Sequence, residues 1–113
     1  MHEMSIAVSI VGTLKDEMTL HPGTVLKKIR LGIGEFSGVE VESLKFSLDA
    51  ALAEENWSGV EVEISKVPLR GACKQCGNEF ELEPADFRCP ACGSGEFAIE
   101  AGQSVTIDSI VVE

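Results

Sequence analysis

The sequence predicts an α+β fold in which two helices pack on a small three-stranded sheet, with a cysteine-rich module inserted before the last strand. Three observations support this. Two segments place apolar residues at helical spacing, three segments are rich in β-branched residues, and residues 69–102 hold all four cysteines. The chain has 113 residues, the length of one compact domain with a single main core. We assign residues 1–68 and 103–113 to an α/β domain and residues 69–102 to the inserted module.

A first helix is predicted over residues 4–18. Apolar residues form two adjacent helical stripes and so a wide apolar face: Met4, Val8, Val11 and Met18 on one stripe, Ile6, Ile10 and Leu14 on the other. His21-Pro22-Gly23 ends the helix, because proline cannot continue the hydrogen-bond ladder and glycine permits a turn. We interpret His21 as a partner of the helix dipole at its C-terminal end.

Residues 25–33 are predicted to form a half-buried strand. A period of two runs through this segment, interrupted only by Lys27, and places one set of apolar residues on one face: Val25, Ile29, Leu31 and Ile33. Residues 34–38 follow as a loop.

A second helix is predicted from residue 41 to about residue 56. Its apolar residues recur at helical spacing: Val41, Leu44, Leu48, Ala51 and Leu52. Glu40 and Glu42 lie near the positive end of the helix dipole, where carboxylates are favourable. Trp57 follows the helix, and we interpret it as a lid over the core.

Two further strands complete the predicted sheet. Residues 60–65 alternate valine and isoleucine with polar side chains, and residues 105–112 are β-branched with a phase change near Asp108 or Ser109 that indicates a bulge. The order strand, helix, strand favours a right-handed crossover with the first two strands parallel in one sheet.

The cysteines form two C-x-x-C-G knuckles, Cys73–Gly77 and Cys89–Gly93, with twelve residues between the inner cysteines. A two-residue spacer lets both sulfurs of a knuckle reach one ion at about 2.3 Å, and the glycine permits the positive φ of the turn. Cys73, Cys76, Cys89 and Cys92 together close a tetrahedron without an open position for water, which predicts a structural Zn²⁺ in a zinc-ribbon-like module. A module this short needs such a metal in place of a core.

Other states of the cysteines are weaker interpretations. Two disulfides or four free thiols fit poorly with this spacing in a chain that has no secretory signal order at its N-terminus. Iron in a rubredoxin-type site is the closer rival, because the ligand set is the same for both ions. Zinc is favoured, because electron-transfer modules need little beyond the knuckles and this chain carries a full domain besides.

Met1-His2-Glu3 also invites metal chemistry. A histidine at position two can offer its imidazole, its own backbone amide and the preceding α-amine to one ion. Glu3 adds a further amide nitrogen and a carboxylate, and such a nitrogen-rich set suits Ni(II) or Cu(II). Taken alone, His2 is better explained as an ordinary exposed histidine.

Composition and charge argue against several classes of function. Nineteen acidic and nine basic residues give a net charge of −10, which repels nucleic acid and anionic membranes. No apolar run approaches the ~20 residues that cross a bilayer, so we expect a cytoplasmic protein. The sequence contains no Ser-His-Asp order, phosphate-binding glycine loop or Cys-His nucleophile, so no enzyme activity is predicted. The carboxylates of the second helix and strand are interpreted as solvated faces: Glu54, Glu55, Glu61 and Glu63.

Over essentially its whole length the chain resembles the HypA/HybF family of hydrogenase maturation proteins. The resemblance rests on three features: the Met1-His2-Glu3 start, the pattern C-x2-C-x12-C-x2-C after Val67-Pro68, and the segment Leu44–Leu48. It implies a nickel metallochaperone without catalytic activity, which helps to insert Ni(II) into the [NiFe]-hydrogenase large subunit together with a HypB-type GTPase. In some organisms such proteins also serve urease, where a urease accessory protein would be a further partner.

The resemblance also assigns roles to residues. His2 would be the essential nickel ligand, with Glu3 as a neighbouring contributor or docking residue, and the four cysteines would hold zinc. Ni²⁺ is then transient cargo and Zn²⁺ a structural cofactor. Some relatives place histidines in or beside the zinc module, but residues 70–102 contain none. A zinc-ribbon interaction adaptor and a rubredoxin-like iron carrier are the alternatives.

Overall fold

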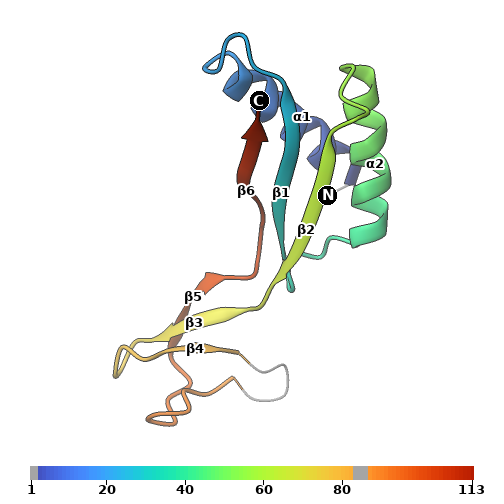
Figure 1. Cartoon of the computed structure of the whole chain (residues 1–113). Coiled ribbons are helices and arrows are strands. Elements are labelled where there is room, and N and C mark those ends of the chain that lie inside the picture. The colour runs from blue at the N-terminus through green and yellow to red at the C-terminus, as the bar shows by residue number, and fades with distance from the viewer. Residues whose placement is uncertain (1–2, 83–86) are drawn as a thin grey trace. The chain divides into compact units, whose positions relative to one another are not determined.

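The computed structural model describes residues 3–82 and 87–113. Within them the chain forms two helices and two three-stranded sheets, with strand orders β2-β1-β6 and β4-β3-β5 (Figure 1). The elements are α1 (Glu3–Met18), β1 (Leu26–Gly34), α2 (Val41–Glu54), β2 (Glu61–Val67), β3 (Arg70–Cys73), β4 (Glu79–Glu81), β5 (Phe97–Ala101) and β6 (Val105–Val112). The predicted α+β class, with two helices and a three-stranded sheet, is confirmed. The second sheet was not predicted.

The chain divides into two compact units. Unit 1 comprises Met1–Leu31, Val39–Ser65 and Thr106–Glu113, and unit 2 comprises Gly32–Gly38 and Lys66–Val105. That residues 69–102 fold as a separate metal-dependent module stays a prediction. In the described part of the chain, no helix combines the length and the apolar character that a membrane span needs.

In unit 1, α1 and α2 pack against each other on the same side of the β2-β1-β6 sheet (Figure 1). Both helices bury a stripe of residues with i, i+3, i+4, i+7 spacing: Ala7, Ile10, Val11 and Leu14 from α1, and Leu44, Ser47, Leu48, Ala51 and Leu52 from α2. Burying a leucine or isoleucine side chain contributes about 1.5–3 kcal/mol relative to leaving it exposed, so these stripes hold the layer together.

The predicted apolar face of α1 was too wide. Met4 is 46% exposed and Val8 is 59% exposed, whereas Ala7, which was not among the residues predicted for this face, is fully buried. The helix packs on one side only, and a narrow stripe centred on a small residue allows a closer approach than a broad apolar face.

The start of α2 is fixed by Glu40. Its carboxylate accepts hydrogen bonds from the backbone N–H groups of Glu42 at 3.3 Å and Ser43 at 2.7 Å, which satisfies two donors that have no partner within the helix. These bonds, chiefly that from Ser43, lower the pKa of Glu40. The helix ends at Glu54, slightly earlier than predicted, and Asn56 then adopts a left-handed φ of 61°. Trp57, which we predicted to be a lid over the core, is half-buried.

β1 is the central strand of unit 1. Lys28 pairs with Glu61 and Glu63, and further along both strands the Leu31 carbonyl accepts a hydrogen bond from the Ser65 hydroxyl. β1 and β2 are therefore parallel, as predicted. Val25 and Glu113 exchange backbone hydrogen bonds of 2.8 and 2.9 Å, which makes β6 antiparallel to β1.

The burial pattern of β1 differs from the predicted alternation. Leu26 is 3% exposed and Val25 is 57% exposed, the reverse of the predicted faces at the start of the strand. From Leu31 to Gly34 every residue is buried, so this end of the strand is not half-buried. The β6 segment was predicted correctly. Half-buried and exposed residues alternate along it as far as Asp108, and the residues after Asp108 are all half-buried. The predicted bulge near Asp108 or Ser109 stays a prediction.

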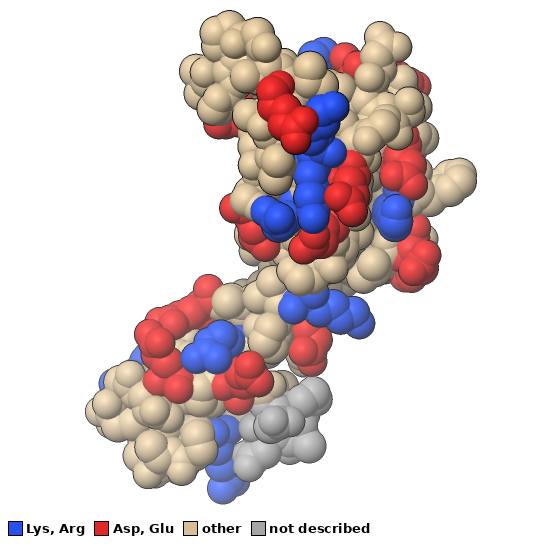
Figure 2. Space-filling view, in the orientation of Figure 1, with Lys and Arg blue, Asp and Glu red and all other residues tan. Residues whose placement is uncertain are grey.

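The interpretation of the acidic residues as solvated faces was incomplete. Glu61 and Glu63 are exposed, but both pair with Lys28, and Glu63 also lies 3.6 Å from Arg30. A hydrogen bond and the charge of Lys28 lower the pKa of Glu63. Figure 2 shows basic side chains flanked by acidic ones on the visible face of the molecule.

Unit 2 is built around β3, which lies between β4 and β5 in antiparallel pairing. A small core fills it: Leu69, Cys73, Phe80, Leu82 and Cys89, with Phe97 packed against it. The rings of Phe80 and Phe97 meet edge to face at 6.2 Å, a favourable aromatic geometry. Residues 69–102 thus have an apolar core that was not predicted from the sequence, and two of the cysteines belong to it.

Three chain segments of unit 2 meet beside this core. Three backbone N–H groups donate to backbone carbonyls: that of Gly34 to Ser104 at 2.9 Å, that of Glu35 to Val67 at 2.8 Å, and that of Phe36 to Gly102 at 2.8 Å. The loop predicted at residues 34–38 is therefore tied into the cysteine-containing unit by backbone hydrogen bonds.

Candidate metal centre

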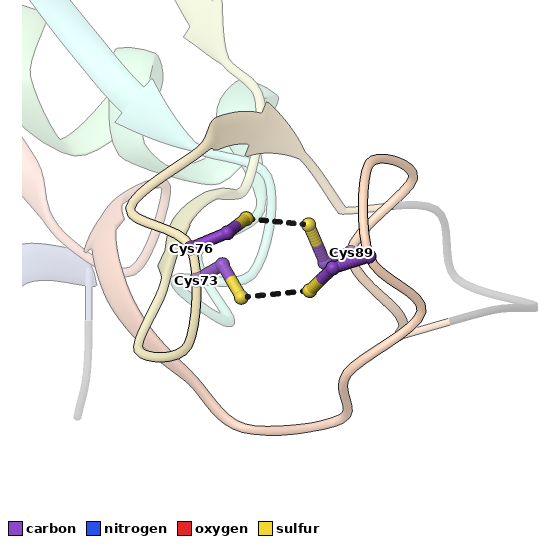
Figure 3. A group of neighbouring side chains, drawn as sticks. Cys73, Cys76 and Cys89 are labelled. Atoms are coloured by element: carbon purple, nitrogen blue, oxygen red, sulfur yellow. Dashed lines mark hydrogen bonds between the residues drawn. The ribbon is translucent and has the colours of Figure 1, made fainter.

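The four cysteines come together from two loops. Cys73 ends β3 and Cys76 lies in the turn to β4, while Cys89 and Cys92 lie in the segment before β5. All four sulfurs lie within 4.8 Å of one another, and two contacts join the two knuckles: Cys73 Sγ to Cys92 Sγ at 3.5 Å and Cys76 Sγ to Cys89 Sγ at 3.6 Å (Figure 3). None of the four cysteines forms a disulfide.

The two knuckles have the same backbone structure. The Gly77 N–H donates to the backbone carbonyl of Cys73 at 2.9 Å, and the Gly93 N–H donates to the backbone carbonyl of Cys89 at 2.8 Å. Both glycines have the predicted positive φ, 76° and 78°, which a residue with a Cβ adopts only with strain. The local sequence therefore bends each loop so that its two sulfurs face the same point.

The cysteines differ in burial within each knuckle. Cys73 is 3% exposed and Cys89 is 2% exposed, whereas Cys76 and Cys92 are exposed. The first cysteine thus anchors each knuckle in the core of unit 2, and the second faces solvent.

The thiols also differ in acidity. Burial opposes ionisation of Cys89, but backbone N–H groups of Cys92 and Ala91 outweigh it and lower its pKa to about 6. The N–H of Ser94 favours ionised Cys92, but the neighbouring thiols and desolvation raise its pKa to about 12. Hydrogen bonds, first from the Cys76 backbone, lower the pKa of Cys73. For Cys76, the N–H of Asn78 lowers the pKa, but the Cys89 thiol and burial raise it overall.

This arrangement fits a divalent metal ion. Four thiolates at this spacing repel one another, so protons or a cation must compensate their charge. A tetrahedral site with Zn–S bonds of about 2.3 Å has sulfur–sulfur edges of about 3.8 Å, and the sulfurs already lie close to that separation. The donor set of Cys73, Cys76, Cys89 and Cys92 is therefore a candidate metal site that needs little rearrangement.

The predicted nickel ligands are only partly described. His2 lies outside the described residues, and so does Met1; Glu3 is the first residue of α1 and is half-buried. His21 lies beyond the end of α1, with Nε2 3.3 Å from Glu17 Oε1.

One residue of the cysteine site was not predicted from the sequence. Asn78 Nδ2 donates to Cys89 Sγ at 3.8 Å, from the first knuckle to the second. Its place directly after the knuckle glycine was the available signal, because that residue begins the return of the loop to β4.

Comparison with known proteins identifies the family. Residues 1–112 match the family model described as "Hydrogenase/urease nickel incorporation, metallochaperone, hypA". A hydrogenase maturation factor HypA of Chlorobaculum tepidum is 39% identical over 113 residues, and one of Chlorobaculum parvum is 36% identical, each alignment covering 100% of both chains.

Two solved structures share the fold. The solution structure of the Ni metallochaperone HypA from Helicobacter pylori has a TM-score of 0.74 and 20% identity, covering 97% of this chain and 96% of that one. A second HypA solution structure has a TM-score of 0.76 and 21% identity, with coverage of 97% and 94%. The matches to the family model and the curated relatives span the whole chain, and the chain belongs to the HypA family of nickel metallochaperones for hydrogenase maturation.

Proposed function

We propose that this chain binds Ni(II) through His2 and Glu3 with backbone nitrogens, holds a structural Zn²⁺ in its four cysteines, and delivers the nickel to a hydrogenase. The observation that carries the proposal is the closed set of four sulfurs within 4.8 Å of one another. Such a set leaves no open position for exchange, so the nickel cargo needs a second site.

The cysteine site suits zinc better than nickel. Zn²⁺ has no geometric preference from d electrons and accepts a tetrahedral thiolate set, whereas Ni(II) favours planar or tetragonal sites with nitrogen and oxygen donors. Two buried anchoring cysteines in the core of unit 2 favour a permanent structural ion over a transient one.

The start of α1 supports a site at His2 and Glu3. Glu3 is the first residue of the helix, so its backbone N–H has no acceptor within the helix and is available for other interactions. An imidazole, a carboxylate and amide nitrogens give Ni(II) a suitable donor set with few protein ligands. A site with few donors also gives up its ion more readily to a more complete site in the acceptor.

Delivery requires partners. We propose a HypB-type GTPase and the [NiFe]-hydrogenase large subunit as partners, with a urease accessory protein as a further one, on the basis of family membership. The chain itself would bind and transfer the metal and catalyse no reaction, in keeping with the metallochaperone description of the family.

Metal analysis and nickel titration test the proposal. The purified protein should contain one zinc per chain, and calorimetry should show one added Ni(II). His2→Ala should abolish nickel binding and leave zinc unchanged, while His21→Ala should leave both unchanged, since His21 is the matched histidine outside the proposed site. Wild-type nickel affinity in His2→Ala would disprove the nickel site.

A residue added before Met1 tests the α-amine. Nickel binding should weaken if that amine is a donor, whereas an unchanged affinity would leave His2, Glu3 and backbone amides as the set. Finding coloured, iron-containing protein in place of zinc would support the rubredoxin-like alternative.

A further inference from the structure

Asn78 contacts three of the four cysteines. Its carbonyl accepts a hydrogen bond from Cys73 N–H at 2.9 Å, and its backbone N–H donates to the Cys76 thiol. Its side-chain Nδ2 donates to Cys89 Sγ at 3.8 Å. The first two bonds stay within the first knuckle, whereas the third crosses to the second. One residue therefore joins the two halves of the site.

The second knuckle has Ser94 at the equivalent position. Its carbonyl accepts from Cys89 N–H at 2.9 Å and its N–H donates to the Cys92 thiol, so the backbone pattern repeats. The Ser94 hydroxyl, however, accepts from Glu96 N–H at 3.0 Å and makes a turn contact of its own. The contact between Asn78 and Cys89 is therefore a property of the asparagine side chain and not a by-product of the shared backbone.

The recipient of this hydrogen bond is an anchoring sulfur of the site. Cys89 is 2% exposed and belongs to the apolar cluster with Phe80 and Leu82. A thiolate in such surroundings is costly unless N–H groups donate to it. Donors around metal ligands orient those ligands and reduce the excess negative charge of a four-thiolate site.

We propose that Asn78 is a positioning residue of the metal centre, whose side-chain amide holds Cys89 toward the ion and slows release of the metal. The inference rests on the proposed occupancy of the four cysteines by a metal. It adds a residue outside the ligand set that links the knuckles across the site.

Zinc release to an excess of chelator tests this on the full-length protein. Asn78→Ala removes the donor and keeps the backbone bonds, and partners of this kind change metal affinity by roughly tenfold to a hundredfold. We expect zinc release to be faster by at least about tenfold. Asn78→Asp has the same size but places a carboxylate toward the thiolate, so it should release zinc at least as fast. Ser94→Ala, the matched control, should release zinc at the wild-type rate.

Cobalt substitution gives a readout that a merely structural role would not change. Loss of an N–H donor makes a thiolate a stronger electron donor, so the sulfur-to-cobalt charge-transfer band of Asn78→Ala should move to lower energy, while that of Ser94→Ala should not. Wild-type release rates and an unshifted band in both Asn78 variants would overturn the role of Asn78. A wild-type protein that retains neither zinc nor cobalt would overturn the metal assignment itself.

Discussion

Gly34 and Gly102 approach each other so closely that a Cβ atom on Gly34 would lie 2.4 Å from the carbonyl carbon of Gly102. Gly102 has a φ of 100°, and a Cβ there would lie 2.5 Å from the Cα of Leu69. Three segments of unit 2 thus cross with backbone against backbone. Only glycine fits at these two positions, because the atoms in the way belong to the main chain and cannot rotate aside.

Gly102→Ala should destabilise unit 2. The substitution combines a positive φ, which costs of order 1–3 kcal/mol, with a clash against the backbone of residues 68 and 69. We expect unit 2 of the variant to unfold at a lower urea concentration than in the wild type and to lose zinc faster. Gly12→Ala is the control, because a Cβ at this exposed helix position meets nothing within 4 Å and should stabilise the protein by up to about 1 kcal/mol. A Gly102→Ala protein as stable as wild type would show that the segments can separate at little cost.

Cys73→Ala should abolish zinc binding and unfold the cysteine module, because three thiolates no longer complete the site and metal binding supplies much of the folding free energy of such modules. Unit 1 should persist. Trp57, the single tryptophan, lies in unit 1, so its fluorescence reports that unit, while amide spectra report residues 69–102. Simultaneous loss of the Trp57 signal and the module signals would contradict a separate module.

Glu63→Gln should lower the stability of unit 1 at pH 7 but not in acid. The Lys28 contact lowers the pKa of Glu63 in the folded state, so the carboxylate contributes stability above its unfolded pKa, and that contribution is lost as pH falls through the folded value. The urea midpoint, followed by Trp57 fluorescence, should differ between variant and wild type at pH 7 and converge below about pH 4. Glu61→Gln, whose carboxylate lies 3.7 Å from Lys28, should have the smaller effect. A difference that grows in acid would contradict this assignment.

Nickel binding should weaken as pH falls through the range in which His2 is protonated, because only neutral imidazole binds a metal. The unperturbed histidine pKa is ~6.5, so the change should fall between about pH 7.5 and pH 5.5. Zinc should be retained further into acid, since four thiolates share one ion. Titration of nickel at several pH values, with zinc measured in the same samples, checks this. A flat nickel affinity would favour a carboxylate site such as one built on Glu3.

Several features were predictable from the sequence because their causes are local. The spacing of apolar residues located α1, β1, α2, β2 and β6, since 3.6-residue and 2-residue periods follow from backbone geometry alone. The C-x-x-C-G spacing likewise predicted both knuckles and the positive φ of Gly77 and Gly93. Family membership also followed from short motifs at the start and in the module.

Other features depended on contacts between distant segments. β3, β4 and β5 are short, so they show too few residues for a period, and only their pairing around Gly71 makes them a sheet. At the start of β1, Leu26 is buried and the preceding Val25 is exposed, the reverse of what the alternation of apolar residues predicted.

The sequence by itself thus determined the helices, the main strands and the two cysteine knuckles of the candidate metal site, because each depends on residues a few positions apart. The tertiary structure decided which cysteines are buried, that Asn78 reaches from one knuckle to Cys89, and that Gly34 meets Gly102, 68 positions further along the chain. These relationships depend on packing in three dimensions, where a side chain and its partner come from segments whose separation no local pattern encodes.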